Sequence, residues 1–146
     1  MNTEENRTAH ERAVFEEAGE VKLADTDAAG VLFFANAFKL AHNAYESFMA
    51  SIGLSLNRII RSSDYLLPIV HAEADYKSPL RLGDRFSVSL KSKVQTHSFV
   101  LTAYFKGAAG DIAAEVRTVH VSVSKGSGKK TPLSDELRKG LMTISS

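Results

Sequence analysis

The sequence contains no cysteine. This absence excludes a disulfide framework, a metal site built from thiolates and a cysteine nucleophile. Long apolar runs are also missing, because no stretch approaches the ~18 consecutive apolar residues that a membrane helix needs. The segment Met1 to Arg12 is polar and charged, and it lacks the apolar core of a signal peptide. We therefore expect a cytoplasmic protein without a membrane partner.

The sequence also lacks an excess of charge of either sign. It has 18 Lys and Arg residues against 17 Asp and Glu residues, for a net charge of +1. Bulk electrostatics therefore gives no reason to expect nucleic acid as a partner. The five histidines show no His-Glu-x-x-His or similar spacing, so we predict no metal ion and no cofactor. The length of 146 residues fits a single domain.

One segment has a clear helical period. Its apolar residues recur at steps of three and four: Phe38, Ala41, Tyr45, Phe48, Met49 and Ile52. Asn36 suits the N-cap position, and Gly53 follows the last periodic residue as a stop signal. The pattern predicts a long helix over about Ala37 to Ile52.

Much of the remaining chain alternates with the period of two that is typical of strands. One strand is predicted within 13–24, and four follow the helix, within Tyr65–Tyr76, around Phe86–Lys91 and Phe99–Phe105, and in Ile112–Ser124. Short connections favour antiparallel neighbours. Strands that are apolar on one face need another element packed against that face. We predict an α+β hotdog fold, in which an antiparallel sheet of about five strands wraps around one long central helix. The predicted organisation is an arm at 1–12, the hotdog domain at 13–124, and a linker with a weak helix at 125–146.

The loop before the helix carries a family resemblance. The segment Asp27–Phe34 (DAAGVLFF) resembles the signature of the 4-hydroxybenzoyl-CoA thioesterase-like branch of the hotdog superfamily. Leu67–Ala72 also resembles a block of that branch, and the likeness extends over about Phe15 to Val123. Within the branch, Leu23–Val31 and His42–Phe48 are similar to hydrolases of 1,4-dihydroxy-2-naphthoyl-CoA, which act in phylloquinone and menaquinone biosynthesis.

The resemblance implies an acyl-CoA thioesterase with assigned roles for several residues. Asp27 corresponds to the catalytic carboxylate, as a nucleophile or as a general base on water; the sequence leaves both alternatives open. The backbone N–H of Phe34 corresponds to the donor that polarises the carbonyl, and Gly30 allows a close approach of the backbone to the substrate. His42 corresponds to the position that faces the acyl ring. Enzymes for 4-hydroxybenzoyl-CoA carry an Asp there, so His42 argues for another ring, such as dihydroxynaphthoyl.

Further substrate contacts are expected from His71 and Ser98, with a structural role as an equally open alternative for His71. His97 and His120 are interpreted as ordinary surface or interface residues. Basic side chains that remain candidates for the CoA phosphates are Arg81, Arg85, Lys91, Lys93 and Arg117. A hotdog protomer leaves a sheet edge exposed and its pocket incomplete, so we expect a homodimer or homotetramer with the active site at a subunit interface.

Other interpretations of the same residues stay open. Asp27 can simply cap a turn, which is the common role of an Asp in such a loop. Asp25 is expected to support the loop, and Glu46 to be solvated or to form a salt bridge. A hydratase of this fold would carry a His-Phe-Pro-x-x-Pro motif, which the sequence lacks. The chain could also be a non-catalytic module that binds acyl-CoA or an acyl carrier. Only the intact Asp27 segment argues against this alternative.

Overall fold

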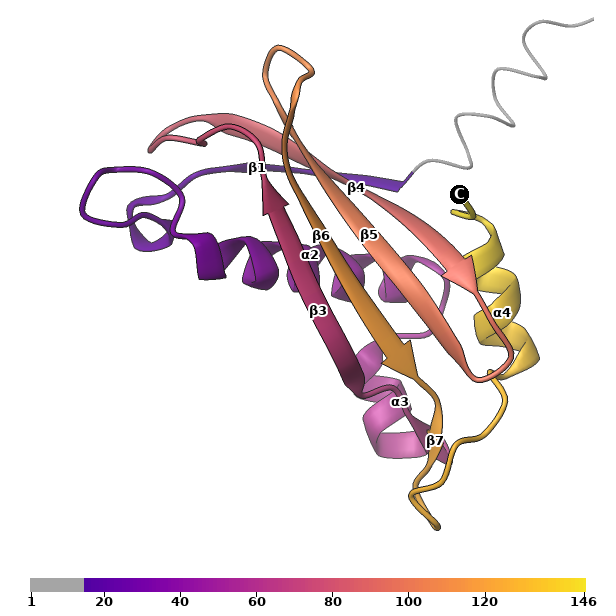
Figure 1. Cartoon of the computed structure of the whole chain (residues 1–146). Helices are drawn as coiled ribbons and strands as arrows, with labels where there is room; N and C mark the ends of the chain where they lie inside the picture. Colours follow the sequence, from indigo (N-terminus) through magenta and orange to yellow (C-terminus); the bar gives the residue numbers. More distant parts are fainter. Residues whose placement is uncertain (1–14) are drawn as a thin grey trace, which may run out of the picture.

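A five-stranded antiparallel sheet, in the order β1–β4–β5–β6–β3, forms the body of the computed structural model (Figure 1). The structure describes residues 15–146, so the predicted arm at 1–12 lies outside the described residues. The strands are β1 (Phe15–Glu20), β3 (Ile69–Tyr76), β4 (Arg85–Val94), β5 (Ser98–Gly107) and β6 (Ile112–Val121). Five antiparallel strands with one long helix confirm the predicted α+β hotdog fold.

Alternating side chains explain why one face of this sheet is covered. In β5, the buried side chains are Phe99, Leu101, Ala103 and Phe105. The residues between them, such as Thr102 and Tyr104, are only partly buried and face the other side. A turn with Gly110 at φ +87° joins β5 to β6, which is a backbone conformation that favours glycine. The sequence pattern therefore fixes which face of β5 meets the helix.

The long helix α2 (Phe34–Ser51) crosses the covered face of the sheet (Figure 1). Its buried residues are Ala37, Ala41, Ala44, Tyr45, Phe48 and Met49. Gly53 (φ +79°) follows the helix, and the N–H of Leu54 donates to the Met49 carbonyl, so the predicted carboxyl end is confirmed. The predicted amino end is wrong by three residues, because Phe33 and not Asn36 occupies the N-cap position.

Smaller elements close the two ends of the fold. A short helix α3 (Leu56–Ser62) leads to a two-stranded ribbon of β2 (Tyr65–Leu66) and β7 (Val123–Ser124). The last helix, α4 (Asp135–Met142), packs against β4 with Leu137 and Leu141 fully buried. The hydroxyl of Ser92 in β4 donates to the Leu141 carbonyl at 2.6 Å, which ties α4 to the sheet.

Strand β3 forms one end of the sheet and pairs only with β6 among the described strands. Most of its residues are exposed, including Ile69 (42% exposed) and Val70 (61% exposed). Edge strands of natural proteins normally carry charges or a cover, because free backbone groups recruit further strands. Strand β3 therefore differs from such edges, because exposed apolar side chains lie on it.

Candidate active site

The loop between β1 and α2 holds the side chain of Asp27 in a fixed position. Asp27 Oδ1 accepts hydrogen bonds from the N–H groups of Ala29 (2.8 Å) and Val31 (3.3 Å). The Asp27 N–H donates to the Val31 carbonyl at 2.9 Å, which closes the turn. Asp27 therefore does cap a turn, but with one oxygen only. Its second oxygen, Oδ2, accepts no hydrogen bond from residues 15–146 and remains free for a ligand.

The turn is attached to the segment that precedes β4. The N–H of Leu82 donates to the Gly30 carbonyl at 2.9 Å, and the N–H of Leu32 donates to the Leu80 carbonyl at 2.7 Å. Gly30 has φ +74°, and no atom lies within 4 Å of the position that a Cβ would occupy there. The glycine is thus required by its backbone conformation and not by crowding.

Asp25 supports both the loop and the start of α2, as the sequence predicted. Its Oδ2 accepts from the Lys22 N–H at 2.9 Å. Its backbone carbonyl accepts from the Phe33 N–H (2.9 Å) and from Asn36 Nδ2 (3.0 Å). The side chain of Asn36 is therefore hydrogen-bonded to the loop, and the amino end of α2 has no side-chain cap.

The amino end of α2 is open as a result. The N-cap residue Phe33 makes no side-chain hydrogen bond to the helix, and the first turn contains no acidic residue. Within residues 15–146, no acceptor lies opposite the Phe34 N–H. Free N–H groups and the positive end of the helix dipole make this end suitable for binding negative charge.

Asp27 and Phe34 line the same surface hollow, which has a volume of about 500 Å³. Its other walls come from Val31–Phe33, from Tyr76 at the end of β3 and 77–80 after it, and from Ala114 of β6. A free carboxylate oxygen and an open backbone donor at one cavity are the two groups that attack on a carbonyl requires. Asp27 and Phe34, which the sequence predicts to act together, thus line one hollow.

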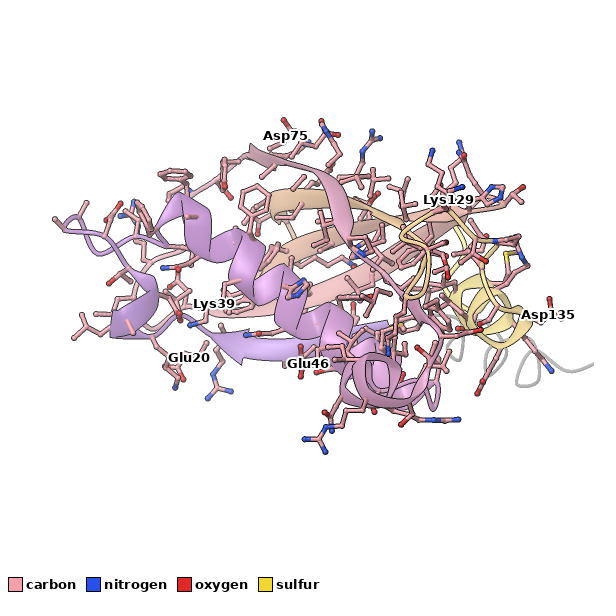
Figure 2. The ribbon with its side chains drawn as sticks, turned by 90° about the horizontal axis from the view of Figure 1, so that it is seen from below. Glu20, Lys39, Glu46, Asp75, Lys129 and Asp135 are labelled. Atoms are coloured by element: carbon pink, nitrogen blue, oxygen red, sulfur yellow. The ribbon has the colours of Figure 1, made fainter. Side chains whose placement is uncertain are left out.

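A second hollow lies further along α2, where His42 is. It has a volume of about 370 Å³, and His42 shares its walls with Phe38 and Tyr45 of the helix and Thr118 of β6. Most of its lining is apolar, and its volume falls in the range of small-molecule sites, about 300–1,000 Å³. Figure 2 shows Glu46 beside β1, on the side of α2 away from Asp75 of β3, and Glu46 is exposed there.

Two of the predicted substrate contacts lie elsewhere in the protomer. His71 is exposed, and its Nε2 lies 3.5 Å from Glu73 Oε2, next to the 2.7 Å ion pair of Glu73 with Arg117. Ser98 lines a hollow of about 420 Å³ with His97 and Lys130. Ser98 pairs with Val121 at the far end of the sheet, so one chain does not bring it to Asp27.

Sequence reasoning missed Tyr76, which joins the site from β3. Its hydroxyl donates to the backbone carbonyl of Phe34, the first residue of α2, and its ring lines the hollow of Asp27. No local pattern signals this contact, because 42 residues separate Tyr76 from Phe34.

The expectation that His120 is an ordinary surface or interface residue is wrong. His120 is only 1% exposed, and its ring stacks on Phe99 with centroids 4.7 Å apart. Burial lowers the pKa of His120 to about 4, while the Leu67 backbone opposes this shift and His42 adds to it. Thr118 and His120 turn toward the helix side, and a neutral histidine packs there as an aromatic ring.

No helix within residues 15–146 has the length and apolar content required to cross a bilayer. Over the same residues, no three His, Asp or Glu side chains gather as the ligands of a metal ion would.

Known proteins are similar to this chain in both sequence and fold. Residues 21–141 match the profile of the thioesterase-like superfamily. A 1,4-dihydroxy-2-naphthoyl-CoA hydrolase of Rippkaea orientalis is 36% identical over 125 residues, which cover 83% of this chain and 90% of the relative. The corresponding hydrolase of Synechocystis is 39% identical over 116 residues, covering 78% of this chain and 84% of the relative.

A solved structure agrees with these sequence matches. The crystal structure of a 1,4-dihydroxy-2-naphthoyl-CoA thioesterase from Synechocystis superposes with a TM-score of 0.83 at 35% identity. The superposition covers 88% of this chain and 96% of that chain.

Proposed function

This chain belongs to the thioesterase-like superfamily, and we propose that it hydrolyses the thioester of 1,4-dihydroxy-2-naphthoyl-CoA at the hollow of Asp27 and Phe34. The reaction consumes water and releases an aromatic carboxylate and free CoA. Its relatives are named for this substrate, and the sequence resemblance implies a step of phylloquinone or menaquinone biosynthesis. The observation that carries the proposal is the single hollow lined by Asp27, whose Oδ2 accepts no hydrogen bond from residues 15–146, and by Phe34, whose N–H has no acceptor there.

In the proposed reaction, the thioester carbonyl oxygen accepts a hydrogen bond from the Phe34 N–H. Negative charge builds on that oxygen during attack, and an open helix end stabilises it without any rearrangement. One preorganised donor of this kind is typically worth about 2.7–4 kcal/mol of barrier. The donor belongs to the backbone, so the identity of the Phe34 side chain matters little to this step.

Asp27 supplies the attacking group from the other side of the carbonyl. Either Oδ2 attacks the carbonyl carbon and water later hydrolyses the anhydride, or Oδ2 takes a proton from a water molecule that attacks directly. The Oδ1 contacts with Ala29 and Val31 support both routes, since they hold the carboxylate in one orientation.

The acyl ring is assigned to the hollow of His42 and Tyr45. Phe34 and His42 lie eight residues apart on α2, or about 12 Å at the rise of an α-helix. The ring is bonded directly to the carbonyl held at Phe34, so it occupies the near end of this hollow, where Phe38 lies about 6 Å along the helix from Phe34. The apolar walls there suit an aromatic acyl group.

We also propose that two chains pair along β3 and complete each site between them. An antiparallel pair places the Ile69 end of one β3 beside the Tyr76 end of the other. Ser98 lies toward the Ile69 end, and Asp27 toward the Tyr76 end, about 25 Å away at the rise of eight strand residues. Pairing of this kind brings the Ser98 hollow of a second subunit toward Asp27. Exposed Phe34 and Val70 (each 61% exposed) support a covered surface here.

A panel of acyl-CoA thioesters, assayed by release of free thiol, tests the proposal. We expect hydrolysis of 1,4-dihydroxy-2-naphthoyl-CoA by the wild type, and a loss of about 10²–10⁴-fold in kcat for Asp27→Asn. Asp25→Asn is the matched control in the same loop, and it should retain most activity because an Asn oxygen still accepts from Lys22. Absence of any hydrolysis by the wild type, or full activity of Asp27→Asn, would contradict the proposal.

The two routes for Asp27 differ in where solvent oxygen appears. In a single turnover in ¹⁸O-labelled water, direct attack by water places the label in the acid product. Attack by Asp27 forms a mixed anhydride, and water that cleaves it at the Asp27 carbonyl places the label in the Asp27 carboxylate and leaves the acid product unlabelled. Label in the Asp27 peptide, measured by mass spectrometry, therefore identifies the anhydride route.

A further inference from the structure

The hollow that Ser98 lines is polar, in contrast to the apolar hollow of His42. It has a volume of about 420 Å³, and its polar walls come from the turn between β4 and β5 and from Lys130. Among the described residues that line it, none is acidic, and the apolar ones are Val119 and Val121 of β6. A hollow with basic and hydroxyl side chains and no carboxylate is suited to a ligand that carries negative charge.

Lys130 lines this hollow from the segment that follows β7. Backbone hydrogen bonds fix the chain on both sides of it: the Ser124 N–H donates to the Lys129 carbonyl at 2.8 Å, and the Thr131 N–H donates to the Ser122 carbonyl at 2.9 Å. Lys130 is exposed, and it forms no ion pair with a carboxylate in the part of the chain that the structure describes. Its positive charge is therefore available to a ligand.

The turn between β4 and β5 adds two backbone donors to the hollow. The N–H groups of Thr96 and His97, which both line it, donate no hydrogen bond to any described residue. The carbonyls of Gln95 and Thr96 accept from Arg138 Nη2 of α4, at 2.8 Å and 3.2 Å. The N–H and the C=O of one trans peptide point in opposite directions, so both free N–H groups point away from Arg138.

Arg138 does not line the hollow itself, so its contacts position the turn. Two backbone hydrogen bonds add to them, from the Leu133 N–H to the Thr96 carbonyl (3.0 Å) and from the Ser122 N–H to the His97 carbonyl (2.8 Å). The donors of the turn are thus held in place before any ligand arrives. Preorganised groups lose little conformational freedom on binding, which favours affinity.

The basic residues named from the sequence for the CoA phosphates lie elsewhere. None of them lines the Ser98 hollow, as a comparison with its described lining shows: they are Arg81, Arg85, Lys91, Lys93 and Arg117. Arg117 is also paired with Glu73 at 2.7 Å, so its charge is already compensated. Lys130 was not among these candidates, because only the tertiary structure brings its segment beside the turn before β5.

We propose that Lys130 and the turn at 95–98, positioned by Arg138, bind a phosphate group of the CoA moiety. This inference rests on the proposed thioesterase function and adds the residues that hold the charged end of the substrate. The proposed subunit pair brings the Ser98 hollow of one chain toward Asp27 of the other, so the pantetheine arm connects the phosphate to the thioester. CoA has a ribose 3′-phosphate and a diphosphate, and both offer oxygens to an ammonium group and to backbone N–H donors.

Three 1,4-dihydroxy-2-naphthoyl thioesters that differ in their phosphates test the inference: those of CoA, of dephospho-CoA and of N-acetylcysteamine, which has no phosphate. For Lys130→Gln, we expect KM for the CoA thioester to rise about 5- to 10-fold, because a charge-assisted hydrogen bond is lost. Its kcat, and KM for the N-acetylcysteamine thioester, should stay unchanged. Lys129→Gln is the matched control, since it removes the neighbouring charge from a residue that does not line the hollow.

The dephospho-CoA thioester identifies which phosphate Lys130 binds. If Lys130 binds the 3′-phosphate, the effect of Lys130→Gln disappears with this substrate, and if Lys130 binds the diphosphate, the effect persists. Either result supports the inference. Arg138→Gln should raise KM for the CoA thioester in the same direction without changing KM for the N-acetylcysteamine thioester, while Lys139→Gln on the same helix should change neither.

Other outcomes overturn the inference and leave the thioesterase intact. They are an unchanged KM for the CoA thioester in Lys130→Gln, or an equal rise in KM for all three thioesters. An equal rise for all three in Arg138→Gln overturns the positioning role of that residue. If the wild type cleaves none of the three thioesters nor any other acyl-CoA, the proposed function itself is wrong.

Discussion

The hydroxyl of Tyr76 donates a hydrogen bond to the carbonyl of Phe34 and joins the last residue of β3 to the first residue of α2. Phe34 also carries the open backbone N–H that the proposed reaction uses. The edge strand of the proposed subunit pairing is thus connected directly to the helix end at which we propose that the carbonyl binds.

Removing this bond should affect turnover more than stability. For Tyr76→Phe we expect kcat to fall about 5- to 10-fold, because a neutral hydrogen bond of about 1 kcal/mol no longer orients the start of α2. The free energy of unfolding should decrease by no more than about 1 kcal/mol. Steady-state kinetics and urea denaturation measure the two effects, with Tyr104→Phe as the control. A change in KM alone would show that Tyr76 only contacts the substrate.

The conformation of Gly30 gives a second prediction. An alanine at φ +74° is strained by about 1–2 kcal/mol, so Gly30→Ala should shift the turn that holds Asp27 and reduce kcat. Gly53→Ala is a matched control, since Gly53 has φ +79° and equally open surroundings but lies at the other end of α2. Both variants should lose similar thermal stability, and only Gly30→Ala should lose activity. Equal activity in the two variants would separate the turn from catalysis.

The exposed edge of the sheet predicts how the oligomer can be broken. A lysine in place of Val70 puts a charge on β3, and natural edge strands use such charges to prevent pairing. Val70→Lys should therefore sediment as a smaller species than the wild type and lose most activity. Ile60→Lys is the control, because Ile60 on α3 is as exposed (62%) as Val70 (61%). A Val70→Lys protein of unchanged size would place the subunit interface elsewhere.

His120 should make the protein sensitive to acid. Its pKa is about 4 in the folded chain and about 6.5 when unfolded, so protons bind the unfolded state more readily between these values. Above about pH 6.5 the titration of His120 does not lower the free energy of unfolding. As the pH falls from there toward 4, this free energy decreases by about 3 kcal/mol. Denaturant titrations from pH 7 to pH 4 should show a shallower pH dependence for His120→Gln than for the wild type. His97→Gln, at an exposed position, should retain the wild-type slope.

Local sequence signals were accurate where neighbouring residues decide the structure. The three-and-four spacing of α2 and the stop at Gly53 correspond to the observed helix and its carboxyl end. The start was misplaced because Asn36 was read as a side-chain cap. Its amide instead reaches the Asp25 carbonyl, eleven residues away, and the helix extends back to an uncapped Phe34.

The position of His120 shows the same limit in a strand. Alternation predicts which residues share a face, but it does not say which face turns inward when both carry partly apolar residues. Stacking on Phe99 and the bond to Thr118 secure His120 on the helix side.

The sequence by itself determined the long helix, the alternating strands and the carboxylate turn, since each depends on residues a few positions apart. Only the tertiary structure decided that Tyr76 meets Phe34 and that Tyr45 lies against His120. Those contacts join segments dozens of residues apart, and they follow from how the helix and the sheet bury their apolar faces together, which no short stretch of sequence encodes.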